Sequence, residues 1–136
     1  MKNRIIIPYF TKLVGHYYTT PENLIGKESL RMNQQLSQLY KTTDLFFLQA
    51  SDDGMSLSGI KEYDKLLISI QNDFKPTDIV VLTFDDQPAI IRYVQEEDNH
   101  YIVKSTNPNY PTTILSKESV QIFGIVLKVW PEISFI

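Results

Sequence analysis

Residues 46–68 read FFLQASDDGMSLSGIKEYDKLLI, and this stretch decides how the rest of the chain is interpreted. An apolar run at 46–48 leads into a polar turn, SDDGM, at 51–55. A second turn, KEYD at 61–64, leads into another apolar run at 66–68. Short apolar runs bounded by Asp, Gly and Ser are typical of strands joined by turns. The stretch therefore predicts a strand, a short turn and a second strand.

The chain after residue 44 continues this pattern of short strands. The near-continuous apolar run DIVVLTF at 78–84 indicates a central strand, and the turn at 85–86 makes 89–94 its hairpin partner. Turn-forming residues, NPNYP, fill the loop at 107–111. The full set of expected strands is 45–50, 65–69, 78–84, 89–94, 101–104 and 120–130. The sequence thus predicts a mainly β fold of short antiparallel strands.

The first part of the chain is predicted to be an extended N-terminal arm, residues 1–43, in front of a β domain, residues 44–136. Its start is apolar and extended and is interrupted by Pro8. Ser29 is a suitable N-cap for one short helix over residues 30–40.

Composition limits the classes of function. The 136 residues are expected to form one folded domain, and the net charge of −3 with no basic block argues against direct nucleic-acid binding. The absence of Cys excludes disulfides and thiolate metal sites, and His16 and His100 lack metal-ligand spacing. No cofactor or metal is therefore expected. No signal peptide or membrane-length apolar stretch is visible, which favours a cytoplasmic protein without membrane contact.

The stretch ASDDGM at 50–55 resembles the catalytic segment of the LexA/UmuD family of self-cleaving serine peptidases, whose pattern is close to A-S-G-D-S-M. The family's following G-I and G-D turn correspond to Gly59-Ile60 and Tyr63-Asp64 without a gap. The D-I-V-V strand, the Asn-Pro loop and the final F-G-I-V strand follow in the family's order, so the resemblance covers nearly the whole chain. It implies the family's β fold.

In this frame the two residues of the family's Ser-Lys dyad are replaced. The nucleophilic Ser falls on Gly54 and the basic Lys falls on Ile91. Arg92 is the next residue, but neighbouring strand residues point to opposite faces and a guanidinium stays protonated, so it is not expected to replace the base. The prediction is that the chain is not an enzyme but a pseudo-peptidase.

The arm resembles the UmuD branch of the family. Residues 7–14, IPYFTKLV, and 31–36, RMNQQL, match that branch's pattern. The bond that the family cuts, Ala-Gly or Cys-Gly, falls on His16-Tyr17, so the cleavage site is also predicted to be lost.

The alternative to a lost dyad is a relocated one. A nearby hydroxyl could act as nucleophile and a lysine as base, the candidates being Ser51, Ser56, Ser58, Lys61, Lys65 and Lys104. The structural interpretation is that these serines are turn residues and the lysines are solvated, since most lysines have a pKa near 10.4. The carboxylates at 52–53 and 85–86 are interpreted as turn residues in the same way.

The resemblance implies a role in protein–protein binding during the SOS response and error-prone DNA damage tolerance, as a non-cleavable brake on an error-prone polymerase. The expected partners are a second copy of the chain, a UmuD paralogue, an error-prone polymerase or a RecA filament. The alternating apolar residues of the last strand suggest a dimer interface, namely Phe123, Ile125, Leu127 and Val129. The alternatives are an active self-cleaving peptidase with relocated residues and a dimeric pseudo-peptidase regulator outside DNA repair.

Overall fold

A computed structural model of the chain describes residues 6–13, 29–31, 44–85 and 87–131. Its strands are β1 (Ile6–Phe10), β2 (Ser29–Arg31), β3 (Leu45–Gln49), β4 (Lys65–Ile70), β5 (Ile79–Phe84), β6 (Ile90–Glu96), β7 (His100–Lys104), β8 (Thr113–Ser116) and β9 (Val120–Trp130). Two short 3-10 turns, η2 (Ser56–Ser58) and η3 (Lys117–Ser119), complete the described elements. The predicted mainly β fold is confirmed. None of the described helical segments has the length and hydropathy that crossing a bilayer requires.

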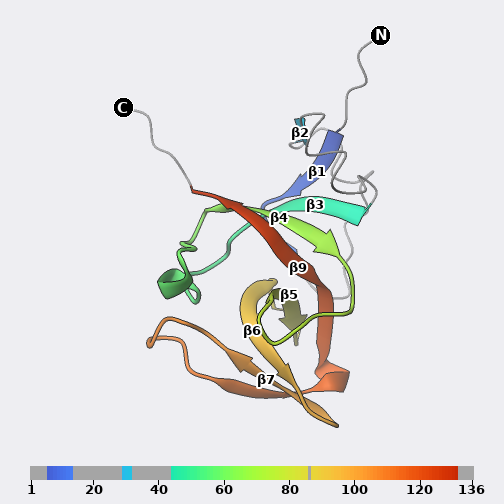
Figure 1. Ribbon diagram of the computed structural model, residues 1–136, viewed down its shortest axis with the longest axis vertical. Helices are drawn as coiled ribbons and strands as arrows, with labels where there is room; N and C mark the ends of the chain where they lie inside the picture. The colour runs from blue at the N-terminus through green and yellow to red at the C-terminus, as the bar shows by residue number, and fades with distance from the viewer. Residues whose placement is uncertain (1–5, 14–28, 32–43, 86, 132–136) are drawn as a thin grey trace.

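The strands form a sheet in the order β2-β1-β3-β4-β9-β5-β6-β7-β8. Strand β9 lies in the middle: its first half pairs antiparallel with β5 and its second half antiparallel with β4. Figure 1 shows β9 running between a part that holds β1, β3 and β4 and a part that holds β5, β6 and β7. Strand β9, the last strand that the structure describes, therefore joins the two parts.

Strand β5 is an interior strand, as its apolar sequence predicts. It lies between β9 and β6, and Val80, Val81 and Leu82 are fully buried. Burying one such aliphatic side chain contributes about 1.5–3 kcal/mol. Opposite faces of the strand serve different clusters, since Val81 packs with Phe46 and Met55 whereas its two neighbours pack with β6 and β7.

Register shifts in β9 break the alternation on which the predicted dimer interface depends. The pairing skips Leu127 opposite β4 and Phe123 opposite β5, which is the signature of a β-bulge. As a result Phe123 and Val129 belong to one cluster, Ile125 packs against a second and Leu127 against a third. The four residues do not share one face, and Phe123 lies in the core of its own chain.

Part of the predicted arm is integrated into the body. Strand β1 pairs parallel with β3 through Tyr9↔Phe47 and Phe10↔Leu48. Ile7 and Phe10 are buried, and so is Leu13, beyond the end of the strand. Residues 29–31, where the predicted helix was to begin, form β2 antiparallel to β1. The rest of that helix and the predicted cleavage site at residues 16–17 lie outside the described residues.

Candidate functional site

The segment that carries the family resemblance is a closed loop between β3 and β4. The amide of Ala50 donates to the carbonyl of Asp64 at 2.8 Å, and the amide of Tyr63 donates back to Ala50 at 2.9 Å. The Asp64 carboxylate is buried and accepts from the amide of Lys61 at 2.9 Å. These bonds fix both ends of the loop, so the turn at 51–55 is held at a defined place on the sheet.

A second loop holds Gly54 from the other side. The carbonyl oxygen of Gly54 accepts from the amides of Thr106 and Asn107, at 2.9 and 3.0 Å. The Asn107 side-chain Nδ2 donates to the carbonyl of Asp53 at 3.0 Å. The loop of turn-forming residues at 107–111 thus has a structural purpose, because it fixes the backbone of the turn.

Arg92, on β6, forms the main charged contact of the site. Its Nη1 and Nη2 donate to Oδ1 and Oδ2 of Asp52 at 3.0 and 2.8 Å, and Nη1 also donates to the carbonyl of Ile91 at 2.7 Å. The Arg92 side chain is only 7% exposed and that of Asp52 20%. The guanidinium carbon lies 5.2 Å from the centre of the Tyr110 ring. A buried guanidinium is tolerated because it has this bidentate partner.

The guanidinium of Arg92 lies directly against Gly54. A Cβ atom added to Gly54 would overlap the end of the Arg92 side chain. Gly54 does not have a positive φ, so its backbone does not require glycine. The residue against position 54 is therefore Arg92. Ile91, onto which the family resemblance was expected to place the lysine, is buried in the core with Met55 and Ile60.

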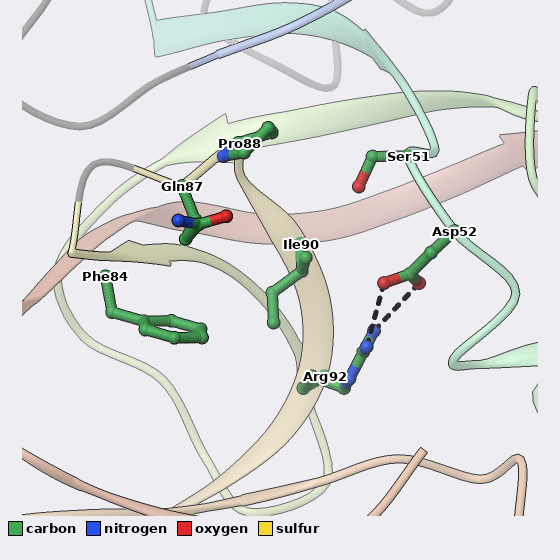
Figure 2. A pocket seen from close by; sticks show the side chains of 7 residues that line it. All are labelled: Ser51, Asp52, Phe84, Gln87, Pro88, Ile90 and Arg92. Atoms are coloured by element: carbon green, nitrogen blue, oxygen red, sulfur yellow. Dashed lines mark hydrogen bonds and ion pairs between the residues drawn. The ribbon is translucent and has the colours of Figure 1, made fainter. Parts of the chain in front are cut away.

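A pocket of about 340 Å³ opens beside this contact. Figure 2 shows Ser51 and Asp52 facing a side that is apolar except for Gln87, with the dashed contacts of Arg92 at one end. The Ser51 hydroxyl donates to the carbonyl of Ala89 at 2.8 Å. The remaining lining residues are Phe84, Gln87, Pro88 and Ile90. The pocket therefore combines apolar side chains with one hydroxyl, one side-chain amide and one ion pair.

The other candidate nucleophiles and bases lie elsewhere. Ser58 donates to the hydroxyl of Thr106 at 3.3 Å, and Lys104 donates to the side chain of Gln95 at 3.0 Å. Lys65 lies over the rings of Tyr9 and Phe47. Of the serines and lysines proposed from the sequence, Ser51 lines the pocket. Within the described residues no three His, Asp or Glu side chains are grouped as a metal site would need.

Sequence reasoning missed Asp52, Arg92 and Tyr110 as a unit. A useful signal was present, because an arginine inside the apolar strand sequence IIRYV has to find a partner when the strand is buried. The identity of that partner is not visible locally, since Asp52 is 40 positions away in the sequence. Asp52 is thus more than a turn residue: it accepts from the amide of Gly54 at 2.9 Å, as an Asp in a turn does, and it also binds Arg92. Asp53 accepts from the amide of Glu62, nine residues further along the chain, at 2.7 Å.

Comparison with known proteins finds similarity to LexA repressors. The chain is 27% identical over 111 residues to the LexA repressor of Pelagibacter ubique (strain HTCC1062), covering 82% of this chain and 49% of that protein. It is 35% identical over 81 residues to that of Clostridium novyi (strain NT), covering 60% and 39%. It is 30% identical over 86 residues to the LexA repressor of Bacillus subtilis (strain 168), covering 63% of this chain and 41% of that protein. The chain spans about half the length of these relatives, or less.

A family model, described as Peptidase S24-like, matches residues 13–127. This match contradicts the prediction that the chain is not an enzyme, because the family is one of peptidases and the matched relatives are named as LexA repressors. The prediction depended on placing the family's Ser at Gly54 and its Lys at Ile91. In the structure, the side-chain atoms nearest to a Cβ at residue 54 belong to Arg92 and not to Ile91. The chain belongs to the Peptidase S24-like family, the LexA/UmuD family that its sequence resembles.

Proposed function

We propose that this domain acts in the cytoplasm during the SOS response by binding other proteins, and that it restrains an error-prone DNA polymerase. The observation that carries the proposal is the family match over residues 13–127, together with relatives named as LexA repressors. The resemblance of residues 7–14 to the UmuD branch supports the polymerase as partner. Binding of this kind requires no cleavage of a peptide bond.

The proposal is tested by recovering the protein with a C-terminal tag from its host, before and after ultraviolet irradiation. We expect an error-prone polymerase, a UmuD paralogue or RecA to co-purify after irradiation and to be absent when the untagged chain is expressed. The purified chain should then lower lesion bypass by that polymerase in a primer-extension assay. Recovery of the chain alone, or bypass that does not change with added protein, would contradict the proposal.

A second candidate function is self-cleavage with a relocated nucleophile, and one observation favours it. Among the alternative serines, Ser51 lines the pocket and lies next to the Asp52–Arg92 ion pair. The Ser51 hydroxyl donates a hydrogen bond to the carbonyl of Ala89, so that bond has to break before the hydroxyl attacks a peptide carbonyl. The attack also requires a base to take the hydroxyl proton, and Asp52 is the carboxylate that lines the same pocket.

This candidate is tested by incubating the purified chain with activated RecA filaments and following its mass. Shortening from the N-terminus that is abolished by Ser51→Ala and retained in Ser56→Ala would support Ser51 as nucleophile. A chain of unchanged mass, or cleavage that persists in Ser51→Ala, would rule Ser51 out.

We further propose that the chain forms a homodimer, as the resemblance implies. Strand β9 already has neighbours on both edges, β4 and β5, so a contact through β9 has to use a face of the sheet. Light scattering at several concentrations tests this: a mass of twice 15.8 kDa is expected, and a monomer throughout the range would contradict it.

A further inference from the structure

The contact between position 54 and Arg92 has chemical consequences for the site, whichever partner the domain binds. A Cβ at Gly54 would lie closer to the guanidinium atoms of Arg92 than non-bonded atoms pack, while Ile91 is buried in the apolar core. We propose that Arg92 is the residue that sets the chemistry of position 54: its guanidinium places a positive charge there without acting as a base, and any nucleophilic or anionic side chain introduced at residue 54 lies against it.

The position of the guanidinium is determined by three neighbours. The Asp52 carboxylate holds it by two hydrogen bonds, the carbonyl of Ile91 accepts a third, and the ring of Tyr110 lies beside it. Because the side chain is 7% exposed, there is little room for it to move into solvent without breaking these contacts. A guanidinium keeps its charge at all working pH values, so position 54 has a permanent cation beside it.

A steric test uses thermal unfolding. Gly54→Ala should lower the Tm by roughly 5 °C, because the new methyl group displaces a buried, paired side chain. The same substitution in an Arg92→Ala background should change the Tm by no more than about 1 °C, since the obstructing group is gone. In an Ile91→Val background the full penalty should persist. This matched control changes the neighbouring position without touching the guanidinium.

A chemical test uses the fact that the chain has no Cys, so Gly54→Cys introduces a single thiol. The rate of alkylation by iodoacetamide against pH gives the pKa of that thiol. An adjacent guanidinium favours the thiolate, so the pKa should lie about one unit or more below the ordinary value of about 8.5. At pH 7 this corresponds to roughly five- to tenfold faster alkylation than in the Gly54→Cys, Arg92→Met double variant.

The two tests separate the possible outcomes. A penalty for Gly54→Ala that vanishes with Arg92→Ala, or a thiol pKa that rises when Arg92 is replaced and not when Ile91→Val is introduced, supports the proposal. The proposal is overturned if the loss of Tm in Gly54→Ala, or the pKa of the Gly54→Cys thiol, changes with Ile91→Val and not with replacement of Arg92. It is also overturned if these quantities change with neither substitution. If Gly54→Cys does not fold, as judged by circular dichroism, the thermal comparison still decides.

Discussion

The carbonyl oxygen of Leu13 accepts a hydrogen bond from the amide of Ala89 at 2.6 Å, which ties the N-terminal segment to the start of β6. Ala89 in turn accepts the hydroxyl of Ser51 through its own carbonyl. The segment at 6–13 therefore contacts β3 at one end and the rim of the pocket at the other. We expect it to be part of the folded core.

Truncation of a core side chain in this segment tests that expectation. Phe10 is 7% exposed and its ring meets that of Phe46 edge-on, with the centres 5.4 Å apart. Phe10→Ala should lower the free energy of unfolding in urea by about 3–5 kcal/mol, because a large buried ring leaves a cavity. Lys12→Ala, at an exposed neighbouring position, should change it by less than about 0.5 kcal/mol. If Phe10→Ala and Lys12→Ala both change the free energy of unfolding by less than about 0.5 kcal/mol, the segment at 6–13 is not packed against the rest of the sheet.

The hydrogen bond from the Asn107 side chain to the carbonyl of Asp53 predicts a second loss of stability. Asn107→Asp keeps the shape of the side chain but replaces the donating amide by an oxygen that faces the carbonyl of Asp53. The free energy of unfolding should fall by about 1–3 kcal/mol. The control is Asn109→Asp in the same loop, because the Asn109 side chain is exposed. The backbone N–H of residue 109, which donates to Oδ1 of Asn107, is unchanged by this substitution. Comparable losses of unfolding free energy in both variants would mean that the hydrogen bond from Asn107 to Asp53 does not stabilise the fold.

The Asp52–Arg92 ion pair should show strong coupling in a double-mutant cycle. Asp52→Asn leaves a buried guanidinium without its counter-charge and should cost about 2–3 kcal/mol, less than for a fully buried pair because Asp52 is 20% exposed. Arg92→Met removes the cation, so the double variant should be more stable than the sum of the single losses predicts. Strictly additive losses in urea unfolding would show that the pair contributes no specific interaction.

The ion pair between Lys117 and Glu96 predicts a dependence on alkaline pH. The hydrogen bond that the Lys117 ammonium donates to the Glu96 carboxylate, 2.7 Å long, raises the pKa of Lys117 above its ordinary value of 10.5. A raised pKa in the folded state means that the stabilisation is fully present below pH 10.5 and is lost as the pH rises through the folded pKa. The Tm difference between the native chain and Glu96→Gln should thus be constant from about pH 7 to 10 and shrink above that. Glu97→Gln, an exposed neighbour, should show no such trend.

The sequence predicts those elements of the fold that have a strong local pattern. The apolar runs around Leu48, Leu67 and Val81 are strands within a residue or two of the expected bounds. Strand β8 was missed because Thr113–Ser116 is short and lies at the sheet edge, where half of its residues face solvent and leave little apolar periodicity.

The site was predicted less well, for a reason that lies in side-chain length. The alternation rule correctly separates Ile91 from Arg92 and places Ile91 in the core. It does not say which of the two approaches a loop from another part of the chain. Arg92 has the longer side chain and a carboxylate to reach, so it extends to Gly54. Contacts of this kind depend on tertiary structure and leave no mark in the local sequence.

The central place of β9 bears on the order in which the protein is completed during synthesis. Until residues 120–130 leave the ribosome, β4 and β5 each lack one neighbour, and the two parts of the sheet have no shared strand. Both unpaired edges are rich in buried aliphatic residues, which makes the unfinished chain prone to aggregation. The nascent protein is therefore expected to depend on chaperones until its last described strand is inserted.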